Sequence, residues 1–206
     1  MSELILHVDA GFISPWALTA FVALEEKRLP YTLSVRALDK KETFAADYLA
    51  RTQRVPALQR GDFWLAESTA IAEYLAESFP YPLHPRLYPE NLEKRGTCRE
   101  LQSWLRTDLQ ALREERTSTT LWGARASKPL SDAAKQAAQR LFHVVTPLVG
   151  EKTTLFDAWC IADVDVALAL QRLNLNGDEV PPALKAYAEA NWQRPSVAKW
   201  NALNRG

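Results

Sequence analysis

The chain has 206 residues, 47% of them hydrophobic and 24% charged, and its 25 Lys and Arg residues balance 25 Asp and Glu residues. This length suffices for one large domain or two small ones, and the balanced charge gives no net field that favours nucleic acid or an anionic membrane. The sequence contains no long apolar run, and its start, Met1 to Leu4, lacks the basic and apolar regions of a signal peptide. We therefore expect a cytoplasmic protein that binds neither nucleic acid nor a membrane.

The cysteines and histidines show no pattern of a metal site. Cys98 and Cys160 lie far apart in the sequence and form no C-x-x-C motif, which favours buried, reduced thiols over a disulfide or metal ligands. The three histidines, His7, His84 and His143, are scattered without the spacing of a zinc site. We predict no metal.

The chain begins with a strand and a helix. Residues 4–8 form a short apolar run that is typical of a strand. Ser14 followed by Pro15 is typical of a helix start, because serine caps the first turn and proline lacks an N–H that would be unpaired there anyway. Helical periodicity then continues to about Arg28.

A second strand, a second helix and a hairpin follow. Residues 31–35 alternate as a strand, and Asp39 is a candidate cap for a helix that carries Phe44, Tyr48 and Leu49. Residues 57–59 and 63–65 flank a Gly-Asp turn and predict a hairpin, after which a helix runs to Pro80. The order βαβαββα implies a parallel pair joined by a right-handed crossover, with antiparallel strands at the edge.

Four prolines between Pro80 and Pro89 predict a stiff linker over residues 81–89. We expect an α/β domain over residues 1–80 and an all-helical domain over residues 90–206. One long helix of the second domain carries an apolar stripe, and another extends from Ser131 to Gly150. A third begins near Cys160, and shorter helices follow around residues 184–187 and after Pro195. The stripe of the first helix consists of Leu101, Trp104, Leu105, Leu109 and Leu112.

The most informative stretch is Val55-Pro56 ahead of the hairpin, followed by Glu67-Ser68 at the start of a helix. A proline in this position suggests a cis peptide bond, which is essentially confined to proline. Such a turn would leave the N–H and C=O of Val55 unpaired at a strand edge, ready to hold an extended peptide-like ligand. The carboxylate, the hydroxyl and the helix-start N–H groups of Glu67 and Ser68 suit a zwitterionic amino-acid end.

This ordered combination resembles the soluble glutathione transferases along the whole chain. Trp159-Cys160-Ile161-Ala162-Asp163-Val164 is similar to the start of the family's sixth helix, where the Asp bonds back to the cap N–H, and Arg194-Pro195-Ser196-Val197 is similar to a frequent family ending. Cys160 stands where the family usually has Ser or Thr, which weakens this cap by about 1 kcal/mol. The resemblance implies a thioredoxin-like N-terminal domain, an all-helical C-terminal domain and a homodimer, and Ser14 places the chain nearer the bacterial serine-type members than the tyrosine-type ones.

The resemblance implies how glutathione is bound. Val55 and Pro56 would cradle its cysteinyl backbone, Glu67 would hold the γ-glutamyl ammonium, and Ser68 would hold the neighbouring carboxylate. The alternative for Glu67 and Ser68 is simple capping of their helix. For Ser14, the resemblance implies a hydrogen bond to the glutathione sulfur.

This hydrogen bond would increase the fraction of glutathione that is present as thiolate. A free thiol has a pKa of roughly 8.5, so little thiolate exists at neutral pH, and a donor beside a helix N-terminus favours the anion. The alternative is that Ser14 only caps its own helix.

Three basic residues are candidates for the glycyl carboxylate of glutathione, namely Lys40, Lys41 and Arg54. The alternative for the two lysines is a solvated surface, and Arg54 could instead pair with a carboxylate of a partner subunit. Asp108 lies at the edge of an apolar stripe and needs a partner there. In related dimers an acidic residue on this helix reaches the neighbour's γ-glutamyl group; the alternative is a salt bridge with Arg106 or Arg113.

The implied activity is attack of the glutathione thiolate on a small hydrophobic electrophile, or on the oxygen of an organic hydroperoxide as a peroxidase. Such a transferase would serve detoxification and the oxidative stress response, with glutathione as co-substrate and no metal. No cysteine lies near residue 14, which argues against the cysteine-type relatives. The alternative function is a non-catalytic dimerisation or ligand-binding module of the same fold.

Overall fold

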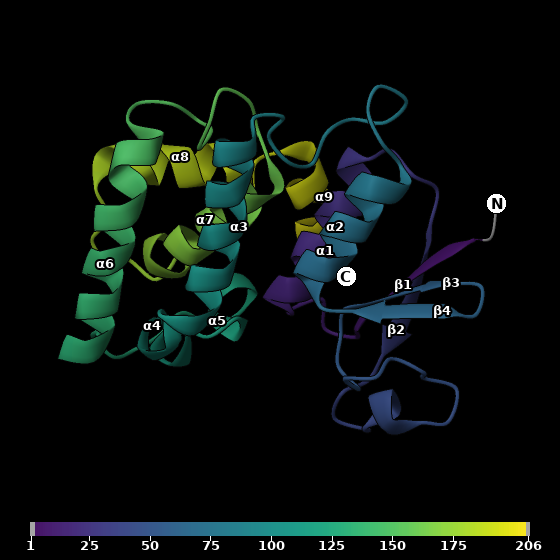
Figure 1. Cartoon of the computed structure of the whole chain (residues 1–206). Helices are drawn as coiled ribbons and strands as arrows, with labels where there is room; N and C mark the ends of the chain where they lie inside the picture. The colour runs from purple at the N-terminus through teal and green to yellow at the C-terminus, as the bar shows by residue number, and fades with distance from the viewer. Residues whose placement is uncertain (1–2, 205–206) are drawn as a thin grey trace. The chain divides into compact units, whose positions relative to one another are not determined.

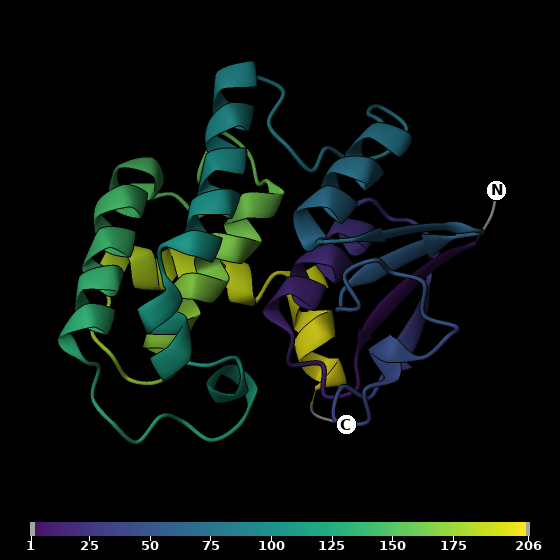
Figure 2. The ribbon, with the colours of Figure 1, turned by 60° about the horizontal axis from the view of Figure 1, so that its bottom comes forward.

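The computed structural model describes residues 3–204 of the chain (Figures 1 and 2). The chain forms two compact units. The first unit extends to Leu87 and includes the residues from Lys199 onward, and the second unit comprises Tyr88–Ala198. In residues 3–204 no helix combines the length and the apolarity that crossing a membrane requires.

The first unit is built on a four-stranded sheet in the order β2-β1-β3-β4. Strands β1 (Leu4–Asp9) and β2 (Thr32–Arg36) are parallel and are joined by helix α1 (Pro15–Glu26). Strand β3 (Ala57–Arg60) runs antiparallel to both β1 and β4 (Phe63–Ala66). The predicted parallel pair, crossover and hairpin are therefore confirmed.

Helices α1 and α2 (Ser68–Ser78) cover one face of this sheet (Figures 1 and 2). The strand side chains that point to this face are the apolar ones, and Leu4, Leu6, Val8 and Leu58 are buried there. Alternation in β1 therefore separates this core from an outer face that carries Ile5 and His7. The core thus lies on the helical side of the sheet.

The last turns of the chain complete this core. Helix α9 (Pro195–Leu203) brings Trp200, which is fully buried, into contact with Phe21 at a centroid distance of 5.3 Å and with Phe12 at 5.4 Å. Lys199 Nζ lies 2.7 Å from the Glu25 carboxylate. These contacts explain why the chain returns to the first unit after residue 198.

The helix expected after Asp39 is absent, so that prediction is wrong. The segment contains only a 3₁₀ turn, η1 (Glu42–Phe44), between Lys41 in the left-handed region at φ 57° and an extended Ala45. The expected apolar face does not form, because two of its three residues are exposed to solvent. Phe44 is 64% exposed and Leu49 is 61% exposed. Tyr48 is buried instead, and its hydroxyl donates to the Arg54 carbonyl at 2.7 Å. This tertiary anchor overrides the local helical periodicity.

The second unit is helical, as predicted, but its first long helix is interrupted. Helix α3 (Leu92–Thr107) ends at Asp108, and α4 (Gln110–Glu115) starts after Leu109, whose φ of −99° and ψ of 27° are not helical. The Thr107 hydroxyl donates to the Asp108 carboxylate at the break. The apolar stripe nevertheless stays buried across the break, because Leu101, Leu105, Leu109 and Leu112 are each at most 3% exposed.

A short α5 (Thr119–Trp122) precedes α6, α7 and α8. Helix α6 (Asp132–Val149) begins and ends as predicted, with the Ser131 hydroxyl accepting from the Ala134 N–H at 3.2 Å and Gly150 at its C-terminus. Helix α7 (Ile161–Asn174) is buried at every residue from Ile161 to Leu173, and α8 (Pro182–Trp192) packs against it.

Asp163 fixes the start of α7. Its Oδ2 accepts from the Cys160 N–H at 2.8 Å, as the capping pattern predicts, and its Oδ1 accepts from the Leu155 N–H at 2.8 Å and from the Tyr187 hydroxyl at 2.7 Å. The carboxylate is fully buried. It therefore ties together the preceding loop, the helix start and α8.

Cys98 and Cys160 are both buried free thiols, as predicted, and their Sγ atoms lie 3.7 Å apart. The hydrogen bond from Cys98 and the burial raise the pKa of the Cys160 thiol. Because alkylation requires an accessible thiolate, we expect iodoacetamide to leave both cysteines unmodified in the folded protein and to modify both after unfolding. Mass spectrometry before and after denaturation measures this, and fast labelling of the folded protein would contradict it.

Candidate functional site

The register of the sheet brings Val55, Pro56 and Glu67 to the same end of the sheet. His7 pairs with Ala57, and Ala57 pairs with Ala66, so Pro56 enters β3 beside the point where Glu67 leaves β4. Both points lie next to the carboxyl end of β1, which leads to Ser14. Pro56 and Glu67 therefore lie side by side at the end of the sheet where β1 leads to Ser14.

Val55 offers an unpaired backbone at this edge. The Val55–Pro56 peptide bond is cis, as predicted. Neither the N–H nor the C=O of Val55 forms a hydrogen bond with any of residues 3–204. The preceding turn is held by the Tyr48 hydroxyl through the Arg54 carbonyl. A peptide-like ligand could therefore pair with Val55 as an added strand.

Ser14 is the N-cap of α1, with φ −74° and ψ 114°. Its Oγ accepts from the Ala17 N–H at 3.3 Å, so the capping interpretation is confirmed. A hydroxyl has one donor hydrogen in addition to its acceptor lone pairs, so capping leaves that hydrogen able to donate to another group. The two roles considered for Ser14 are thus compatible.

The sequence interpretation missed Asp9, which shapes the turn before Ser14. Its carboxylate is 3% exposed and accepts from the Ile13 N–H at 2.8 Å and from the Ser14 N–H at 3.1 Å. An aspartate at a strand end, followed by Gly11, is a typical signal for such a side-chain-to-backbone turn. Asp9 thereby sets the position of Ser14.

Glu67 and Ser68 differ in accessibility. Glu67 has a left-handed φ of 69°, its side chain caps nothing, and it is exposed. Ser68 is fully buried and already has a partner within the protein. The accessible group of this pair is therefore the Glu67 carboxylate.

The basic candidates of the first unit are exposed. Lys40 and Lys41 lie between β2 and η1, beyond the carboxyl end of the strand, and Arg54 directly precedes Val55. Asp108 belongs to the second unit, where it ends α3 and is exposed. In residues 3–204 no cluster of three or more His, Cys, Asp or Glu side chains is arranged to hold a metal ion.

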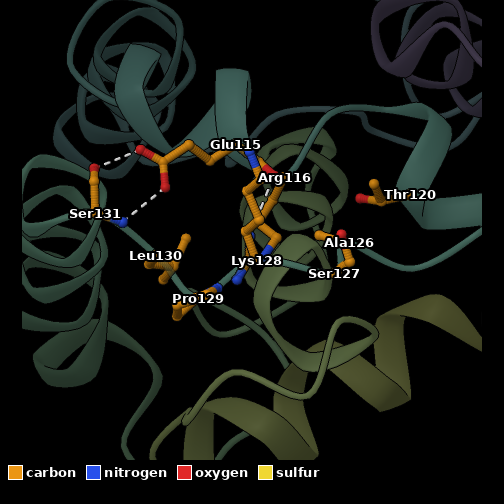
Figure 3. A pocket seen from close by; sticks show the side chains of 9 residues that line it. All are labelled: Glu115, Arg116, Thr120, Ala126, Ser127, Lys128, Pro129, Leu130 and Ser131. Carbon is orange, nitrogen blue, oxygen red and sulfur yellow. Dashed lines mark hydrogen bonds between the residues drawn. The ribbon is translucent and has the colours of Figure 1, made fainter.

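The second unit contains a cavity of about 650 Å³ that none of the predicted site residues lines (Figure 3). Two of its three charged residues, Glu115 and Arg116, are already paired. The Glu115 carboxylate accepts from the Ser131 N–H at 2.8 Å and from the Ser131 hydroxyl, and these bonds lower the pKa of Glu115. Arg116 binds Asp178 through two parallel bonds of 2.6 and 2.7 Å. The third charged residue of the lining, Lys128, is exposed.

Comparisons with known proteins agree with this architecture. Residues 13–78 match the N-terminal domain of glutathione S-transferases, and residues 91–205 match their C-terminal domain. The chain therefore belongs to the glutathione S-transferase family, as the sequence motifs predict.

Individual relatives show the same similarity. A glutathione transferase homologue from Burkholderia gl BGR1, solved with bound glutathione, is 35% identical with a TM-score of 0.81 over 100% of this chain and 99% of that one. Glutathione S-transferase theta-1 of Mus musculus is 30% identical over 110 residues, 52% of this chain and 45% of the relative. The matched segment thus spans less than half the length of this curated relative. A glutathione transferase from Phanerochaete chrysosporium, 19% identical with a TM-score of 0.75 over 100% and 96% of the two chains, shares the fold.

Proposed function

We propose that this chain is a glutathione transferase that binds glutathione extended along Val55. The observation that carries the proposal is the unpaired N–H and C=O of Val55, beside Glu67 and the N-terminus of α1. In this arrangement the cysteinyl backbone pairs with Val55 and packs on Pro56. The γ-glutamyl ammonium binds Glu67, and its carboxylate lies at the N-terminus of α2, where Ser68 stands. The Burkholderia homologue, which covers the full length of this chain, supports glutathione as the ligand.

The chemistry follows from the position of Ser14. The donor hydrogen of its hydroxyl and the positive end of α1 stabilise the glutathione thiolate. The thiolate forms a bond to an electrophilic carbon of a small hydrophobic substrate, and the leaving group departs with the electron pair. Attack on the oxygen of an organic hydroperoxide is a second reaction of the same thiolate. This assignment makes the chain a serine-type member.

The remaining predicted residues complete the proposal. Lys40, Lys41 and Arg54 are exposed and flank the edge where the glycyl carboxylate would lie, so each can supply its counter-charge. Asp108 acts across a homodimer on the γ-glutamyl group of the partner subunit. In this proposal residues 1–80 correspond to the glutathione-binding domain, 81–89 to the linker and 90–206 to the helical segment of a cytoplasmic enzyme, although the chain from Lys199 onward belongs to the first compact unit.

Replacing Glu67→Gln tests the binding mode. Because the change removes a charge-assisted hydrogen bond and keeps the shape of the side chain, the dissociation constant of glutathione is expected to rise about tenfold or more. Isothermal titration calorimetry measures it. The matched control is Glu77→Gln, an exposed glutamate near the other end of α2 that should leave the dissociation constant unchanged.

Two results would count against the proposal in different ways. Unchanged glutathione affinity in Glu67→Gln would exclude only the proposed role of Glu67 and would leave the transferase function standing. If the unaltered protein did not bind millimolar glutathione, the proposed transferase function would be excluded, and a non-catalytic module of the same fold would be favoured.

A further inference from the structure

The first unit carries a cavity of about 300 Å³ at the end of the sheet where β1 begins. A volume of this size is at the lower end of the range for small-molecule sites. Leu4 of β1 pairs with Arg60 of β3, and both line the cavity. Pro56 and Glu67 adjoin the opposite end of the β3–β4 hairpin, and none of the residues proposed to bind glutathione is part of the wall. The apolar part of the wall consists of Leu4, Leu29, Pro30, Tyr31 and Phe79.

Arg60 is a half-buried cation in this wall. It points to the same face of the sheet as Leu58, two residues earlier, and helices α1 and α2 cover that face (Figures 1 and 2). Its guanidinium carbon lies 5.3 Å from the centre of the Phe79 ring, which is another part of the wall. No carboxylate among residues 3–204 forms an ion pair with Arg60. A partly buried charge without a counter-charge is unfavourable, so a bound anion would stabilise it.

The hydrogen bond of Arg60 leaves one edge of its guanidinium open. Nη1 donates to the Tyr74 hydroxyl at 3.0 Å, while Nε and Nη2 have no hydrogen-bond partner among residues 3–204. Both free nitrogens are accessible to solvent, because the unpaired side-chain atoms that are shielded from it in this part of the chain belong to other residues. In a planar guanidinium the edge formed by Nε and Nη2 lies opposite Nη1. The edge therefore points away from Tyr74, which is not part of the cavity wall.

The second unit shows what such an edge binds. Arg116 holds the Asp178 carboxylate with the same two atoms, Nε at 2.6 Å from Oδ2 and Nη2 at 2.7 Å from Oδ1. Two parallel, charge-assisted bonds of this kind are the strongest way in which arginine binds a carboxylate. Arg60 presents the same pair of donors without a partner.

The other polar side chains of the wall do not compete for this edge. Glu3 is the carboxylate of the wall, but it accepts from the Thr32 hydroxyl instead of pairing with Arg60. Nδ1 of His84 lies 3.0 Å from the Lys27 carbonyl, so this nitrogen carries a hydrogen and is already bonded. An incoming carboxylate therefore displaces no partner of Arg60.

We propose that this cavity binds a small molecule that joins one carboxylate to an apolar carbon skeleton. The two carboxylate oxygens accept from Nε–H and Nη2–H of Arg60, and the carbon skeleton packs against Leu4, Leu29 and Phe79. A carboxamide fits less well, because it is uncharged and its NH₂ group would face the donors of Arg60. The site goes beyond the proposed transferase function and is made by the first unit alone.

Benzoate and its neutral analogue benzamide test this site. In protein with ¹⁵N-labelled arginine, benzoate up to about 10 mM should shift the Nε resonance of Arg60 until the shift saturates, while benzamide leaves it in place. The shift should persist when glutathione is saturating, because the two sites share no residue. The Arg60→Lys variant identifies the resonance by its disappearance.

Three variants measure the contribution of the guanidinium by calorimetry. Arg60→Gln removes the charge and the paired donors, so the dissociation constant of benzoate should rise at least about tenfold. Arg60→Lys keeps the charge but not the paired donors, so its dissociation constant should lie between those of Arg60→Gln and the unaltered protein. The matched control is Arg51→Gln, an exposed arginine of the same unit outside the wall, which should bind benzoate unchanged.

Three outcomes would overturn the proposal. The first is the absence of any change at Arg60 Nε with benzoate in the unaltered protein, which needs no variant to fold. The second is equal affinity for benzamide and benzoate. The third is loss of the shift when glutathione saturates the protein, which would place benzoate in the proposed transferase site. None of these outcomes bears on glutathione binding, which calorimetry measures separately.

Discussion

Replacing Asp163→Ala is expected to lower the free energy of unfolding by about 4 kcal/mol, because three buried donors lose their acceptor at once. The donors are the N–H groups of Leu155 and Cys160 and the hydroxyl of Tyr187. Burial raises the pKa of the Asp163 carboxyl, and these hydrogen bonds oppose the rise. For a chain of this length such a loss lowers the melting temperature by about 10 °C.

Denaturant unfolding followed by circular dichroism measures this effect. Tyr187→Phe removes only one of the three donors and should lose about 1 kcal/mol. Asp157→Ala is the matched control, because this exposed aspartate pairs with Lys94 at the surface and should leave the unfolding midpoint unchanged. Equal midpoints for Asp163→Ala and Asp157→Ala would show that the buried carboxylate does not hold α7 in place.

Replacing Ser14→Ala is expected to reduce turnover at pH 7 by about 10- to 100-fold. Losing one hydrogen bond to an anion corresponds to a rise of about one to two units in the pKa of bound glutathione. The thiolate absorbance of the enzyme–glutathione complex, recorded against pH, measures this pKa directly. The pH at which turnover reaches half its maximum should rise by the same amount.

Two variants separate this role from helix capping. Ser14→Thr keeps both the cap and the hydroxyl, so the thiol pKa should stay close to that of the unaltered protein. Ser14→Gly keeps most of the capping free energy but lacks a hydroxyl, so it should behave like Ser14→Ala in turnover. Turnover in Ser14→Gly equal to that of the unaltered protein would leave Ser14 with capping alone.

Local signals predicted those parts of the fold that a few neighbouring residues determine. Ser14, Ser131 and Asp163 cap helices through bonds that span three residues, and each lies where the sequence placed it. The helix expected after Asp39 failed because the burial of Tyr48 depends on Trp64 and His7, which come from other strands. The periodicity of one segment contains no information about contacts with other strands, so it could not predict this one.

The candidate site was predictable to a similar degree. The cis bond at Pro56 and the meeting of Val55 with Glu67 follow from a short motif and a hairpin. The burial of Ser68 and the two hydrogen bonds to Asp9 depend on how the elements pack, so they needed the structure. The cavity beside Arg60 depends on residues from β1, β3 and the end of α2, beyond the reach of any local pattern.

The burial of Trp200 has a consequence for how the protein is made. During synthesis the first 87 residues emerge well before Trp200, so Phe12 and Phe21 lack this packing partner until residue 200 has left the ribosome. The second unit, in contrast, is one uninterrupted stretch of chain. Of the two units, the one that is translated first is thus the later one to complete its hydrophobic core.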